Sequence, residues 1–200
     1  ADEAYADAAD ALTAMRRAGA TRLDQAMARE LAPLKMERAL FRTTVEPGDA
    51  GPEGHDAVAF TVATSPGAPP GQLNKIASGG EQTRINLAIQ IVAAQRSELP
   101  CLILDEADVG VGGTTADTVG RILRELAERT QVICVTHAPQ VAARSHNHMC
   151  VIKNGAHTDI TALSKDERIE ELARMLAGAD VTSKTRDYAK TLLSEASTAH

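Results

Sequence analysis

The chain has 200 residues, enough for one domain with a substantial core, and its aromatic content of only 2% means that Ala, Leu, Ile and Val must form that core. The formal net charge of −6 argues against a free-standing, nonspecific nucleic-acid-binding protein, although a local patch or a missing part of the protein could still contact DNA. No apolar run of about 18 residues and no basic segment followed by an apolar stretch occurs, so we expect neither a membrane span nor a signal peptide. The first residue, Ala1, is not Met, which indicates a fragment or a processed chain.

Residues 1–32 are rich in Ala, Glu, Asp and Arg and are predicted to be helical, with an interruption at Gly19 and an end at Pro33. Two interpretations remain open for this segment. It forms either the last turns of a long coiled coil that enters a globular head or an ordinary pair of surface helices, because its heptad pattern is not sustained.

Two strands are predicted next, over residues 36–45 and 58–64. The segment 47–55 between them is rich in Gly and Pro and predicts a turn or hairpin loop. A second loop, 65–73, leads to the motif Ser78-Gly79-Gly80-Glu81.

The pattern then changes to alternating helices and strands. Helices are predicted over residues 81–95 and 115–129, and continuous apolar strands over 101–104, 132–135 and 149–152. Strands without alternation, separated by helices, indicate a parallel sheet covered on both faces, and therefore an α/β fold. The tail, 165–196, predicts two short helices split by Gly178.

The cysteines indicate a reducing compartment. Cys101, Cys134 and Cys150 are odd in number, and each lies in or beside an apolar, strand-like segment. We therefore expect buried, reduced thiols in a cytoplasmic protein. His146 and His148 could share one face of a strand, but no third ligand is evident, so no metal site is predicted there.

Asp105 and Glu106 follow an apolar strand directly, at the edge where parallel sheets bind ligands. Asp105 would hold Mg²⁺ through water, and Glu106 would accept a proton from an attacking water. The alternative is a pair of solvent-exposed acids at the end of a strand. The Gly-x-x-x-x-Gly-Lys-Ser/Thr loop that cradles phosphates occurs nowhere in the chain, so the sequence predicts half of an ATPase.

Ser78-Gly79-Gly80-Glu81 precedes a predicted helix. Its glycines allow a phosphate to approach the backbone, and the amide groups and positive end of the helix face the anion. The motif also matches a capping box, in which Ser78 caps the helix and Glu81 bonds back to it. Both interpretations can hold at once, since a helix start with free amides is itself an anion site.

His137 follows the strand 132–135 through Thr136 and could hydrogen-bond a terminal phosphate or the attacking water, although one loop histidine is often only a cap. Its strand should neighbour the strand of Asp105, so that their carboxyl ends converge. The glycine-rich segment 108–113 could contact a dimer partner through its backbone, or could be a flexible loop.

Three segments in this order resemble the C-terminal head lobe of RecN-type DNA-repair ATPases, SMC-like members of the ABC ATPase superfamily. They are Ile76–Glu81 with Arg84, Leu102–Val111 and Val135–Ala142. The Asp-Val-Gly extension and the His-x-Pro-Gln-Val-Ala run are typical of RecN rather than of transporters or Rad50. The resemblance covers about residues 33–195. It implies a P-loop NTPase head of the ABC/SMC type, with residues 1–32 as the end of the coiled-coil arm and residues 33–200 as its C-terminal lobe.

The resemblance also implies roles for individual residues. Ser78, Gly79, Gly80 and Glu81 correspond to the signature motif, which acts in trans on ATP held by the Walker A loop of an opposing head. Asp105 and Glu106 are the Walker B pair that binds Mg²⁺ and activates water. Asp108 begins the D-loop and is implied to contact the nucleotide, and His137 is the switch histidine.

The implied function is ATP hydrolysis during head-to-head dimerisation, in the repair of DNA double-strand breaks in the bacterial cytoplasm. The implied partners are the N-terminal Walker A lobe of the same protein, a second head and DNA, with no membrane. This chain alone should be inactive because Walker A is absent. A Rad50- or SMC-type head fragment and a non-catalytic interaction lobe are the alternatives.

Overall fold

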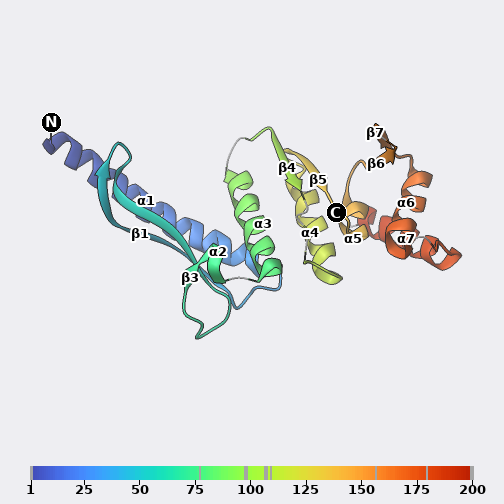
Figure 1. Cartoon of the computed structure of the whole chain (residues 1–200), viewed down its shortest axis with the longest axis horizontal. Coiled ribbons are helices and arrows are strands. Elements are labelled where there is room, and N and C mark those ends of the chain that lie inside the picture. The colour runs from blue at the N-terminus through green and yellow to red at the C-terminus, as the bar shows by residue number, and fades with distance from the viewer. Residues whose placement is uncertain are drawn as a thin grey trace. The chain divides into compact units, whose positions relative to one another are not determined.

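The computed structural model describes residues 2–76, 78–96, 99–105, 108, 110–155, 157–178 and 180–198. The chain divides into two compact units, Ala1–Ser97 and Glu98–His200, and each is described by itself (Figure 1). The division at residue 32 into arm and lobe refers to the complete protein and stays a prediction. Within the described part of the chain, no helix is both long and apolar enough to cross a membrane.

The first unit begins with α1 (Asp2–Leu31), one continuous helix of 30 residues. The interruption expected at Gly19 is therefore wrong, whereas the end before Pro33 is confirmed. A glycine inside a helix costs only about 1 kcal/mol, and packing of the helix outweighs that cost. Met27 and Leu31 are fully buried near its C-terminal end, in the core of this unit.

A three-stranded antiparallel sheet lies along α1 (Figure 1). Its strands are β1 (Leu40–Gly51), β2 (Gly54–Ala63) and the short β3 (Gly71–Gln72), with β1 and β3 at the edges. The hairpin turn predicted within 47–55 is present at residues 52–53, but it is shorter than predicted, because β1 and β2 pair again at Gly51 and Gly54 after a register shift that follows Pro47. Pro47 is compatible with this pairing because an edge strand does not need every N–H in the ladder.

Polar contacts hold the end of this hairpin against α1, which explains why a Gly- and Pro-rich segment remains extended. The Tyr5 hydroxyl accepts a hydrogen bond from Gly51 N–H at 3.0 Å. The Thr13 hydroxyl donates to Asp56 at 2.8 Å, and Arg16 forms an ion pair with the same carboxylate at 3.3 Å. Burial alone would raise the pKa of Asp56, but the bonds from Thr13 and Arg16 outweigh it and hold that pKa below its usual value.

The short helix α2 (Leu73–Ile76) and the long helix α3 (Gly79–Arg96) complete the first unit. The helix predicted over 81–95 is confirmed. Ile85 and Ile91 of α3 are fully buried, as is Val62 of β2. These aliphatic side chains form the core that the low aromatic content predicts.

The second unit contains β4 (Cys101–Asp105) and β5 (Gln131–Val135), which pair in parallel, with α4 (Thr114–Leu126) and α5 (Pro139–Arg144). Leu104 is buried, whereas Ile103 beside it is 68% exposed and its partner Ile133 is 46% exposed. Successive side chains of a strand point to opposite faces. One face of the sheet is thus open in this chain, so that cover on both faces stays a prediction for the complete protein.

The apolar strand predicted over 149–152 does not extend the parallel sheet. It forms β6 (Met149–Asn154), which pairs antiparallel with β7 (His157–Ala162) in a separate hairpin. β7 was not predicted from the sequence, because most of its residues are polar and all of them are exposed. An apolar run indicates a strand but does not specify its neighbour.

The tail forms α6 (Lys165–Ala177) and α7 (Ser183–Thr198), and the predicted split at Gly178 is confirmed. Gly178 has a φ of 67°. Ser164 and Glu167 form a complete capping box at the start of α6. The two helices share a core with α5, which consists of Ala142, Ala143, Leu172, Ala173, Ala189 and Leu192.

Candidate functional site

The first group of predicted site residues begins α3 in the first unit. Glu81 N–H donates to the Ser78 hydroxyl at 3.4 Å, and the Glu81 carboxylate accepts from Ser78 N–H at 3.0 Å. The capping box predicted from the sequence is therefore present. A helix start leaves its first N–H groups without intrahelical partners, and Gly79 has open space beside it. The N-terminus of α3 thus offers backbone donors to an anion.

Arg84 connects this helix start to the remainder of the first unit. Its Nε donates to the Gly80 carbonyl at 3.1 Å, and its Nη1 donates to the Leu34 carbonyl at 3.2 Å. Leu34 itself is fully buried, so the arginine ties the glycine turn to a rigid part of the fold. Arg84 therefore positions the motif.

The second group of residues lies at the carboxyl ends of β4 and β5 in the second unit. Asp105 pairs in register with Val135, which confirms that the two strands are neighbours with converging ends. Asp105 is exposed, and its carboxylate has no ion pair or hydrogen bond within the described residues. An exposed, uncommitted carboxylate suits Mg²⁺, which prefers oxygen ligands and retains water. Glu106, the predicted base, lies outside the described residues.

Asp108 lies just after β4 at this edge and is 8% exposed. Its Oδ2 accepts hydrogen bonds from Thr136 Oγ1 at 2.6 Å, His137 N–H at 3.2 Å and Ala138 N–H at 2.8 Å. Its Oδ1 is buried and has no hydrogen-bond partner among the described residues. Asp108 therefore joins the loop after β4 to the loop after β5.

This bridge was not predicted from the sequence, where Asp108 was expected to contact the nucleotide or a dimer partner. The available signal was Thr136 before His137: a hydroxyl and two backbone N–H groups after a parallel strand can bind a carboxylate from the neighbouring loop. The His137 side chain is exposed, while its backbone is held by Asp108. The histidine is thus presented at the strand edge from an anchored loop.

The electrostatics of this edge affect Cys134 on β5. Burial, followed by the negative charges of Asp108 and Asp105, raises the pKa of the Cys134 thiol to about 11. The thiol is thus protonated and unreactive at neutral pH. Cys101, Cys134 and Cys150 are all free, as predicted, although each is only partly buried. Among the described residues, no cluster of His, Cys, Asp or Glu forms a metal site by itself, so Mg²⁺ would need further ligands.

The fold defines the class of the protein. The structure resembles an Smc head domain with a coiled coil and joint from Pyrococcus yayanosii, with a TM-score of 0.64 and 19% identity, over 79% of this chain and 29% of that chain. A structure from work on ATP-driven dimerization and DNA-stimulated activation of SMC ATPases gives a TM-score of 0.61 and 17% identity, over 83% of this chain and 97% of that chain. The fold is that of an SMC-type ATPase head.

Sequence relatives identify the particular family. The chain is 44% identical over 197 residues to the DNA repair protein RecN of Vibrio cholerae, covering 96% of this chain and 36% of that protein. It is 44% identical over 191 residues to the DNA repair protein RecN of Haemophilus influenzae, covering 92% and 34%. No model of a protein family matches the chain. The chain is a RecN homologue that spans about a third of its curated relatives, which favours RecN over the Rad50 alternative.

Proposed function

We propose that the chain is the C-terminal half of a RecN ATPase head that hydrolyses ATP when two heads engage. The observation that carries the proposal is the anchored strand edge, where Asp108 holds the loop of His137 beside the uncommitted carboxylate of Asp105. In parallel sheets, this edge is where ligands bind.

Each residue of the edge has a separate task in this proposal. Asp105 binds Mg²⁺, which would neutralise phosphate charge when bound. Glu106 accepts the proton of the attacking water, and His137 hydrogen-bonds the terminal phosphate. Asp108 maintains the loop geometry on which the position of His137 depends.

The start of α3 acts on the nucleotide of the opposing head. The donors are the amides of Gly79 and Gly80 and the Ser78 hydroxyl, which in this structure donates to the Glu81 carboxylate at 3.1 Å. Glu81 holds the cap that orients them. Because these donors would reach the phosphate only in the closed dimer, ATP binding favours dimerisation. The relation to work on ATP-driven dimerization of SMC ATPases supports this step.

The missing partner of the fold is an N-terminal lobe of the same protein that carries the Walker A loop. Ile103, Ile133 and Val135 form an open apolar face on the β4–β5 sheet. Val151 and Ile160 are paired across the β6–β7 hairpin and are also exposed, at 64% and 67%. A two-stranded sheet with an open apolar face is unstable alone, so further chain must cover it. The large part of each relative outside this chain can supply that cover.

The name of the relatives supports a role of the complete protein in DNA repair, which we place at double-strand breaks in the bacterial cytoplasm with DNA as a partner. The deciding experiment measures ATP turnover of this chain, of the upstream lobe and of their mixture. We expect turnover only in the mixture, and at least about 10²-fold less with Glu106→Gln. Binding of the two lobes without turnover would instead support a non-catalytic interaction lobe.

A further inference from the structure

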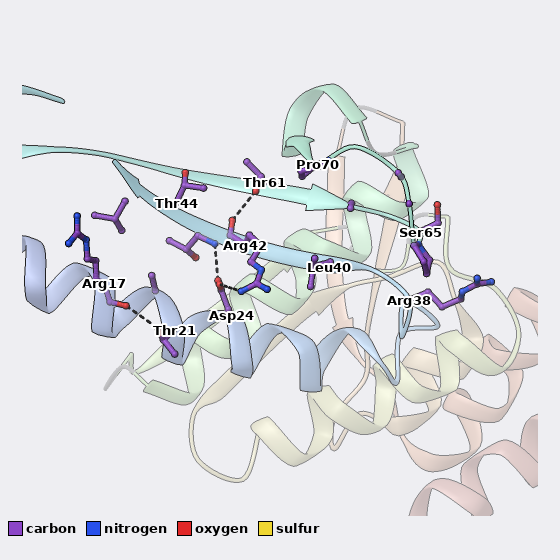
Figure 2. Close-up of a pocket in the computed structure, with 17 residues that line it drawn as sticks. Arg17, Thr21, Asp24, Arg38, Leu40, Arg42, Thr44, Thr61, Ser65 and Pro70 are labelled. Atoms are coloured by element: carbon purple, nitrogen blue, oxygen red, sulfur yellow. Dashed lines mark hydrogen bonds and ion pairs between the residues drawn. The ribbon is translucent and has the colours of Figure 1, made fainter. Parts of the chain in front are cut away.

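A groove of about 650 Å³ lies in the first unit, far in sequence from the strand-edge residues (Figure 2). It runs between α1 and the free edge of β1 and continues to the loop after β2. Arg17 comes from α1, Arg42 from β1, and Arg38 from the turn before β1. Thr44, Thr61 and Ser65 contribute hydroxyl groups to the lining.

The charge of the groove is opposite to that of the chain. Three arginines and one acid, Asp24, line it, whereas the chain as a whole carries −6. Asp24 is neutralised locally, because it forms an ion pair with Arg42 at 3.9 Å and accepts the Thr43 N–H at 2.8 Å. The guanidinium groups of Arg17 and Arg38 have no ion pair or hydrogen bond within the described residues, and both side chains are exposed. The groove therefore presents unneutralised positive charge.

The dimensions of the groove exceed those of a single anion. Arg17 and Asp24 are separated by two turns of α1, which is about 10 Å along the helix axis. The lining continues along β1 from Leu40 to Val45 and then to Pro70. A polyanion with regularly spaced charges fits this length better than one isolated phosphate or carboxylate.

Two observations distinguish between polyanions. An acidic peptide would bind an open strand edge by adding a strand, but Asp24 already occupies the Thr43 N–H in the middle of β1. None of the residues that line the groove is aromatic, so it lacks the stacking platform on which single-stranded bases bind. Guanidinium and hydroxyl groups are instead the usual donors to duplex phosphates.

We infer that this groove binds the sugar–phosphate backbone of duplex DNA, with Arg17 and Arg38 as the phosphate contacts and Arg42 neutralising Asp24 beside them. The inference deepens the DNA contact of the proposed function and assigns it to residues outside the ATP site. It predicts binding that depends on salt and not on base sequence.

The test uses the full-length protein and a labelled DNA duplex, without nucleotide, in fluorescence anisotropy titrations over a salt series. Replacing Arg17, Arg38 and Arg42 together by Ala should reduce the slope of log K against log salt by about 1.8, or 0.9 for each of Arg17 and Arg38, because Arg42 is already paired with Asp24. The matched control replaces three exposed arginines outside the groove, Arg22, Arg29 and Arg121, and should retain the wild-type slope. The triple Lys variant of the groove should recover most of the slope, because Lys also neutralises phosphate.

Equal losses in the groove variant and in its control would overturn the inference, as would a wild-type protein that does not bind the duplex. The inference would also be overturned if a polyglutamate peptide bound the wild-type protein but not the triple Ala variant, while DNA binding of that variant was unchanged. Such a result would assign the groove to an acidic protein segment. ATP turnover is measured separately in each variant. If turnover is absent while the arginine-dependent slope remains, the proposed hydrolysis fails and the groove assignment stands.

Discussion

Asp108→Ala is the most informative substitution at the strand edge, because it separates positioning from chemistry. The Asp108 carboxylate is buried and accepts three hydrogen bonds. Ala138 N–H retains a second acceptor, Thr136 Oγ1 at 3.0 Å, so the variant leaves mainly His137 N–H and the Thr136 hydroxyl unpaired. At about 1.5–3 kcal/mol for each bond to a charged acceptor, the local cost is about 3–6 kcal/mol. Asp108→Asn keeps one acceptor oxygen and should cost about 1–2 kcal/mol.

Hydrogen exchange of peptides that cover β5 and α5, followed over increasing urea, measures this cost locally. Asp105→Ala is the matched control, because Asp105 is exposed at the end of β4, the strand that leads to Asp108, and should change stability by less than about 0.5 kcal/mol. In the assembled head, Asp105→Ala should nevertheless abolish ATP turnover. The reasoning is refuted if Asp108→Ala and Asp105→Ala change exchange at β5 and α5 equally.

Three further substitutions or titrations test separate parts of the structure. Gly120→Ala should destabilise the second unit by about 1–3 kcal/mol, because the new Cβ would lie 2.9 Å from Arg144 Cγ and 3.1 Å from Val141 Cα. Thermal melts measure this loss, and an unchanged melting temperature would contradict that packing. The pKa of Cys134 is raised to about 11 from an ordinary value of 9.0, so the contribution of this thiol to stability is complete below pH 9.0 and is lost as the pH rises towards 11. Alkylation of the Cys134 thiol should therefore stay slow at pH 8. Rapid labelling at that pH would show that the site is open. Ser78→Ala and Ser164→Ala each remove a helix cap and should each lower the free energy of unfolding by about 1 kcal/mol. Only Ser78→Ala should also impair ATP turnover in the assembled head. Equal turnover in the two variants would contradict the assignment of Ser78 to the nucleotide site.

The sequence predicted the parts of the fold that depend on local patterns. The apolar run before Asp105, the helix that starts after Ser78 and the break at Gly178 each have a local cause, and all three are present. Neighbour relations were predicted only where chain order determines them, as for β4 and β5. The pairing of β6 with the polar β7 depends on a tertiary choice that periodicity does not contain.

The segment 47–55 shows why composition alone predicted too long a turn. Its Gly and Pro residues favour a loop, but Tyr5 and Thr13 lie about 40 residues or more upstream and bind the extended hairpin. Such contacts appear only once α1 and the hairpin are folded together. The bridge from Asp108 to Thr136 has the same origin, since its two ends are separated by 28 residues.

The arginine groove illustrates a limit of charge as a sequence descriptor. A net charge of −6 argues against nonspecific nucleic-acid binding only if the charges are spread evenly over the surface. Here α1 and β1 bring Arg17 and Arg42 to one groove, and Asp24 is neutralised inside it by Arg42 and a backbone N–H. At physiological salt, charges beyond about 8 Å are largely screened, so a ligand in the groove responds mainly to these nearby groups. An acidic chain can therefore carry a site for DNA phosphates, and the salt slope measures that site independently of net charge.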